Sequence, residues 1–82
     1  MFHPSRENKL LGGIQRIYTF ENGYGASVVC HRGSYSSRGK KWELAVIGQD
    51  DELCYTTPIT SDVIGHLSDS GVQSILAQIN NL

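Results

Sequence analysis

The chain has little of what marks specialised protein classes. Its 82 residues contain two cysteines, too few for a disulfide scaffold and without the spacing of a zinc or redox motif. No apolar run approaches the ~18 residues of a membrane span. The start of the chain lacks the basic and apolar regions of a secretory signal. We therefore expect one small cytoplasmic domain, residues 1–82, of which residues 1–12 are loosely ordered.

Basic side chains are absent from the second half of the chain. All seven Lys and Arg residues lie in residues 1–41, which hold two glutamates and so carry a charge of +5. Residues 42–82 hold six acidic side chains and carry −6. This division describes the surfaces that the protein offers to partners, and it does not describe the fold.

Strand signals dominate the first half. Residues 14–20 and 24–31 are rich in β-branched and aromatic side chains. Asn22-Gly23 between them predicts a hairpin in which both turn residues adopt positive φ. After a predicted loop at residues 32–40, the sequence predicts further strands in two ranges, residues 41–48 and 52–57.

Alternation along these strands separates two faces of a sheet. The face predicted to be apolar comprises Tyr24, Ala26, Val28, Cys30, Trp42, Leu44 and Val46. The opposite face is only partly apolar, so we expect it to be solvated or used for contact; it comprises Ser27, Val29, Ala45 and Ile47.

Helical signals lie mainly at the end of the chain. Ser5 is a candidate cap for one short turn, and residues 59–67 suit either a short helical turn or a strand. From Ser68, a plausible N-cap, apolar residues recur at helical spacing; they are Val72, Ile75, Leu76 and Ile79. The predicted fold class is α+β, a three- to four-stranded antiparallel meander sheet packed by a C-terminal amphipathic helix.

The clearest candidate contact site is the segment 32–41, called here the basic segment. It contains four basic side chains and one tyrosine and no acid; they are Arg32, Tyr35, Arg38, Lys40 and Lys41. Arginine binds phosphate or carboxylate groups through paired hydrogen bonds, and tyrosine stacks on bases. The segment predicts contact with nucleic acid or with an acidic protein surface. The alternative is a solvated loop whose charges only keep the protein soluble.

No metal, cofactor or catalytic site is predicted. His3, His31 and His66 are scattered and form no recognised ligand spacing. Cys30 and Cys54 fall in apolar strand-like runs, where a thiol acts as a small hydrophobic side chain. We therefore expect a protein that is not an enzyme.

The exposed side of the predicted helix carries short, uncharged side chains. Ser70, Ser74 and Ala77 lie on it at helical spacing. A solvent-facing helix usually carries Lys and Glu, so this surface is a candidate for pairing with a second copy in a homodimer. The alternative is an ordinary polar helix face.

Four stretches, spread from residue 10 to residue 60, carry a resemblance: Leu10–Ile14, Glu21–Val29, Trp42–Ile47 and Thr57–Thr60. In these stretches the chain resembles small, functionally unassigned accessory proteins of tailed bacteriophages. They contain no catalytic motif, so the resemblance assigns no residue a role. It implies a protein that acts inside an infected bacterium, where phage proteins of this size often bind host or defence machinery.

The sequence as a whole predicts a small non-enzymatic binding module. Its expected role is that of a phage-encoded inhibitor or modulator of a host or defence protein or nucleoprotein in the bacterial cytoplasm, with no membrane partner. The basic segment would contact an acidic surface of that partner. Two alternatives stay open, a nucleic-acid-binding protein and a self-associating structural or assembly protein.

Overall fold

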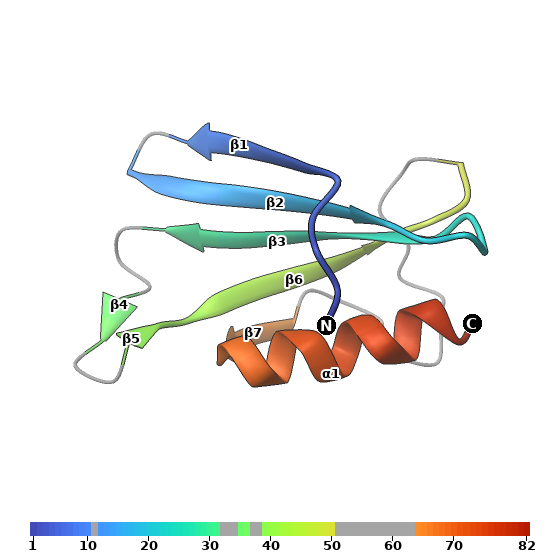
Figure 1. Cartoon of the computed structure of the whole chain (residues 1–82). Coiled ribbons are helices and arrows are strands. Elements are labelled where there is room, and N and C mark those ends of the chain that lie inside the picture. Colours follow the sequence, from blue (N-terminus) through green and yellow to red (C-terminus); the bar gives the residue numbers. More distant parts are fainter. Residues whose placement is uncertain (11, 32–34, 37–38, 51–63) are drawn as a thin grey trace.

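The fold is α+β, with one helix packed on one face of an antiparallel sheet. The computed structural model describes residues 1–10, 12–31, 35–36, 39–50 and 64–82. The main sheet has five strands in the order β1-β2-β3-β6-β7, rather than the three or four predicted (Figure 1). The elements are β1 (Arg6–Leu10), β2 (Gly13–Thr19), β3 (Gly25–His31), β4 (Tyr35–Ser36), β5 (Gly39–Lys40), β6 (Trp42–Ile47), β7 (Ile64–Leu67) and α1 (Asp69–Asn80). The predicted strand at residues 52–57 lies outside the described residues.

Strand β1 occupies the segment where the sequence predicts a short turn. It pairs with β2 without interruption, from Arg6 opposite Ile17 to Leu10 opposite Gly13. Gly12, in the connection, has a φ of 79°, which glycine adopts without steric cost. The prediction of a turn was wrong because the backbone partners of β1 come from β2, and local sequence does not reveal them.

The predicted hairpin between β2 and β3 is confirmed, but its turn differs. The Phe20 N–H donates to the Tyr24 carbonyl at 2.9 Å, and the Gly23 N–H donates to the Phe20 carbonyl at 3.0 Å. Of Asn22 and Gly23, Gly23 alone has a positive φ, at 90°. This is a three-residue loop that ends in a left-handed glycine, in place of the predicted two-residue turn.

Strand β7 settles the alternatives left open for residues 59–67, as far as the structure describes them. Ile64–Leu67 form a strand antiparallel to β6. The pairing is irregular, with a shift between Trp42 and Leu44, and His66 has a φ of 58°. The short length and this irregularity make β7 a poor edge for further pairing.

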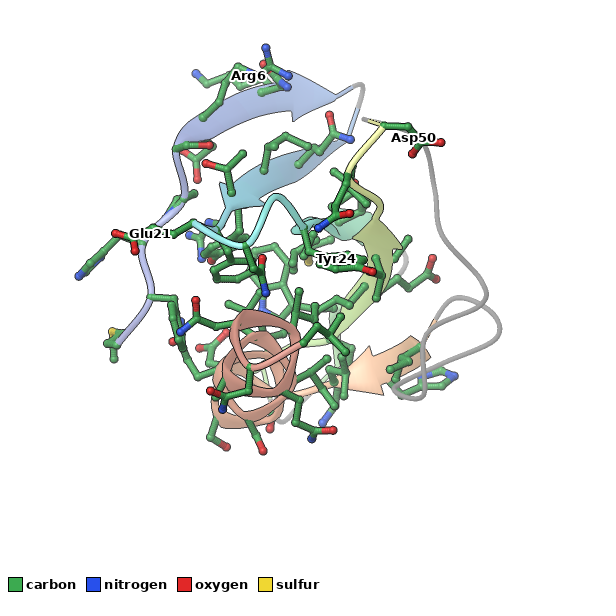
Figure 2. All side chains as sticks on the ribbon, turned by 90° about the vertical axis from the view of Figure 1, so that its right-hand side faces the viewer. Arg6, Glu21, Tyr24 and Asp50 are labelled. Carbon is green, nitrogen blue, oxygen red and sulfur yellow. The ribbon has the colours of Figure 1, made fainter. Side chains whose placement is uncertain are left out.

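The core lies between α1 and the sheet face that curves around it, called here the covered face (Figure 2). Cross-strand register explains its composition, because Tyr18, Ala26 and Val46 are successive Cα partners on neighbouring strands. The buried cluster contains Tyr18, Ala26, Val28, Cys30, Trp42, Leu44, Val46, Val72, Leu76 and Ile79. This confirms the predicted apolar sheet face and helix stripe, with Tyr24 and Ile75 partly buried against the cluster. Burying each large aliphatic or aromatic side chain contributes about 1.5–3 kcal/mol.

The side chain of Asn22 joins the first hairpin to the end of α1. Its Nδ2 donates to the Ile79 carbonyl at 2.9 Å, and its Oδ1 accepts from the Tyr24 N–H at 3.0 Å. Gln49 Nε2 donates to the Asn22 carbonyl at 2.7 Å. The last carbonyls of a helix have no partner inside it, so this amide fixes the helix C-terminus to the sheet.

The other contacts of α1 lie at its start and along one side. Ser68 accepts from the Gly71 N–H at 3.2 Å, which confirms the predicted N-cap. Gln73 donates through Nε2 to the Phe2 carbonyl at 3.1 Å and accepts from the Phe2 N–H through Oε1 at 2.8 Å. The segment before β1 is therefore held against the helix.

Candidate contact site

The basic segment contains a small hairpin where the sequence predicts only a loop. Strands β4 and β5 are antiparallel, with Tyr35 opposite Lys40 and Ser36 opposite Gly39. In Figure 1 this hairpin lies beyond the ends of β3 and β6, at the other end of the sheet from the turn at residues 20–24. The pairing makes Tyr35 and Lys40 direct neighbours, although four residues separate them in the sequence.

The remaining members of the predicted site are placed only in part. Lys41 is half-buried and comes directly before β6. Arg32 and Arg38 lie outside the described residues. The structure thus brings together two of the five predicted positions, and it holds a third at the junction of the hairpin with the main sheet.

One basic residue that the sequence did not single out is used within the fold. Arg16 Nε donates to Glu7 Oε1 at 2.9 Å, and the Arg16 guanidinium carbon lies 4.8 Å from the centroid of the Trp42 ring. Arg16 and Glu7 are Cα partners in the β1–β2 register, a relation that the sequence would have revealed only if β1 had been predicted. Arg16 is therefore excluded from the candidate contact site.

The pKa of the Arg16 guanidinium is raised, and the largest cause is the hydrogen bond to Glu7. Because the pKa of Arg16 is higher in the folded state, the stabilisation that the charged guanidinium contributes is fully present below the pKa of the unfolded chain. It is lost only as the pH rises through the pKa of the folded state. Both values lie far above neutral pH. Arg16 therefore remains charged, and its titration adds no pH dependence to stability near neutrality.

A cavity of about 430 Å³ lies beside Arg16, between the start of α1 and the covered face. Its polar lining includes Arg16, Asp69 and Gln73. Each of these is engaged in the fold, because Asp69 Oδ1 accepts from Trp42 Nε1 at 2.7 Å and Gln73 binds the backbone of Phe2. The polar groups of this cavity hold the N-terminal segment, the helix and the sheet together.

The helix surface predicted for self-association is partly available. Ser70 and Ser74 are exposed and Ala77 is half-buried. Ser70 Oγ lies 3.2 Å from Ser68 Oγ, within the capping turn of the helix. Pairing of this surface with a second copy stays a prediction.

The described part of the chain contains no cluster of side chains of the kind that binds a metal ion. Within those ranges, no three His, Cys, Asp or Glu side chains gather as a metal site would require. His3 and His66 are exposed, and Cys30 is a buried thiol of the core. Cys54 lies outside the described residues. None of the helices that the structure describes has the length and apolarity needed to cross a membrane.

Comparison of the chain with protein-family models, with curated proteins and with solved structures finds no match. The protein is therefore classified by its fold alone. It is a small α+β protein with one described helix on a five-stranded antiparallel sheet. No relative supplies a residue role, so the functional argument rests on the chain's own residues.

Proposed function

We propose that the protein is a small non-enzymatic binding module that contacts a partner with an acidic surface through the basic segment. Its partner is a host or defence protein, or a nucleoprotein, in the bacterial cytoplasm, which the module inhibits or redirects. The resemblance to tailed-phage accessory proteins motivates the choice of a bacterial partner.

One observation carries this proposal, the pairing of β4 with β5 at the end of the main sheet. It makes Tyr35 and Lys40 cross-strand neighbours, and it joins directly to Lys41. Aromatic and basic residues brought together in this way suit contact with carboxylate or phosphate groups. Arg32 and Arg38 add positive charge to the same stretch of sequence.

The distribution of the other basic residues supports the same choice. Arg16 is engaged by Glu7 and Trp42. Arg6 and Lys9 lie on β1 with Glu7 and Asn8 between them. Three positions apart on a strand, the two basic side chains belong to opposite faces of the sheet and form no group of positive charge. The basic segment contains four basic side chains and no acid within its own sequence.

A charge reversal with a matched control tests the proposal. The variant Arg38→Glu/Lys40→Glu reverses two charges in the basic segment, and the control Arg6→Glu reverses one charge on β1. Each protein is immobilised and exposed to bacterial lysate with and without nuclease, and bound species are identified. We expect the wild type and the β1 variant to retain the same species and the basic-segment variant to lose it. Retention by the basic-segment variant, with an unchanged thermal midpoint, would overturn the proposal.

Nuclease treatment and salt distinguish the kinds of partner. A species that survives nuclease is a protein, whereas one that disappears is bound through nucleic acid. Direct titration with a short single-stranded DNA, a duplex and an RNA then measures nucleic-acid affinity at low and high salt. Binding to nucleic acid releases counterions from phosphates, so its affinity falls steeply with salt. Such a result would mean that the partner is nucleic acid and not a protein.

A further inference from the structure

The two edges of the main sheet differ in their capacity to pair. The edge strand β7 is short, has an irregular register and contains a residue with positive φ. The other edge strand, β1, pairs over five residues with β2 in a continuous register. An uninterrupted edge exposes a row of backbone donors and acceptors that another strand is able to use.

The register identifies which backbone groups of β1 point away from β2. Leu10 and Gly13 are Cα partners separated by two residues, and such partners close a hairpin as a hydrogen-bonded pair. Hydrogen-bonded and non-bonded pairs alternate along an antiparallel ladder. The backbone N–H and C=O groups of Glu7 and Lys9 therefore point outward, to the edge at which no strand of the described residues pairs with β1.

The charges on this edge favour one register with a second copy. Antiparallel pairing through the outward groups is able to align Glu7 with Glu7, Lys9 with Lys9, or Glu7 with Lys9. The first two alignments place like charges directly opposite, which destabilises a strand pair. The third is centred on Asn8 and creates two pairs of opposite charge, one on each side of the two-fold axis.

The side chains of Glu7 and Lys9 are accessible for pairing in the register centred on Asn8. Lys9 is exposed, and Glu7 has a half-exposed side chain whose Oε1 accepts from Arg16. Both lie on the covered side of the sheet, because their Cα partners on β2 are Ile14 and Arg16. Glu7 would then lie between Arg16 of its own chain and Lys9 of the second copy.

We propose that β1 pairs antiparallel with β1 of a second copy of this chain, in the register centred on Asn8. The two five-stranded sheets then form one continuous sheet of ten strands, with both helices on the same side. This surface is separate from the basic segment, so the dimer presents two copies of that segment to a partner.

Oligomeric state tests the proposal through a pair of complementary variants. Lys9→Glu places a carboxylate opposite Glu7 of the second copy, and Glu7→Lys places an ammonium opposite Lys9. We expect the wild type to sediment as a dimer that weakens at high salt. Each variant alone should dimerise roughly 10- to 100-fold more weakly. An equimolar mixture of the two variants restores opposite charges at both pairs and should recover the dimer.

The matched control is Arg6→Glu, which makes the same change of charge on the same strand. In the proposed register Arg6 lies opposite Leu10, so its reversal should leave the dimer intact. Circular dichroism melting curves establish that each variant is folded. A wild type that is monomeric at every salt and protein concentration would overturn the proposal, as would a dimer unaffected by the Lys9 and Glu7 variants.

Disulfide trapping tests the register itself. Asn8→Cys places two thiols directly opposite each other across the two-fold axis, at a separation suited to a disulfide. Arg6→Cys places them about four residues apart along the strands, roughly 13 Å. We expect oxidation to cross-link the first variant and not the second, relative to the wild type with its own two cysteines. Cross-linking of the Arg6 variant alone would refute the register.

Discussion

The two faces of the main sheet are built in different ways. On the covered face, Tyr18 of β2 and the side chains of β3 and β6 pack with α1 and are almost wholly buried. On the other face, called here the open face, polar side chains form a row of hydrogen bonds across three strands. Asn8 Nδ2 donates to Gln15 Oε1 at 3.2 Å, and Gln15 Nε2 donates to Ser27 Oγ at 3.0 Å.

The contrast indicates where the stability of the fold resides. Half-buried aliphatic side chains on the open face, Ile17, Val29 and Ile47, lie close to the polar row without a described element over them. The covered face therefore supplies most of the hydrophobic stabilisation. The open face tolerates polar residues because water is able to satisfy them.

The largest difference is expected from two adjacent valines that point to opposite faces. Val28 is buried on the covered face, at 1% exposure, and Val29 is half-buried on the open face. Val28→Ala should lower the free energy of unfolding by about 2 kcal/mol, because it removes buried methyl groups and leaves a cavity. Val29→Ala should lower it by less than about 1 kcal/mol. Urea denaturation measures both, and equal losses would mean that the open face is covered as tightly as the other.

An intermediate effect is expected at Asn22, which fixes α1 over the covered face. Asn22→Ala should lower the free energy of unfolding by about 1–2 kcal/mol, because it leaves helix carbonyls and the Tyr24 N–H without this partner. Asn22→Asp should cost more, since a carboxylate would face the carbonyl oxygens at the negative end of the helix dipole. Thermal and urea denaturation measure both changes. The control is Glu21→Ala, an exposed neighbour in the same turn; if all three variants were alike, the amide would not hold the helix.

The smallest effect is expected in the polar row. Ser27→Ala removes the acceptor of the Gln15 amide, which is only half-buried and is able to bond to water instead. The free energy of unfolding should fall by less than about 1 kcal/mol. Urea denaturation of this variant beside Val28→Ala gives the comparison directly. A loss as large as that of Val28→Ala would show that the row contributes to stability as a cooperative network.

Much of the fold could be predicted because its signals are local. Alternation in β3 and β6 and the apolar stripe from Val72 to Ile79 identify the residues that meet in the core. The strand β1 could not be predicted, because only its last residue is strongly apolar and its pairing depends on β2. The turn was assigned wrongly because Asn-Gly suits more than one hairpin loop, and the contact of Asn22 with α1 favours the longer one.

The candidate site was predictable in composition and not in geometry. Charge density alone identifies the basic segment, but the pairing of Tyr35 with Lys40 depends on a short hairpin with little strand propensity of its own. Sequence spacing also gave no indication that Arg16 would lie over Trp42, which is 26 positions away in the chain. Distinguishing a basic residue used in the fold from one offered to a partner requires the strand register.

The order of elements along the chain has a consequence for how the protein is made. Helix α1 follows every strand of the main sheet, and the hydrogen bond from Asn22 to Ile79 spans 57 positions. The hairpins close over short distances, whereas such long-range contacts form slowly because a large loop must be ordered first. On the ribosome, the apolar side of the sheet therefore stays uncovered until the helix emerges. That interval is when the nascent chain is most exposed to aggregation and to chaperones.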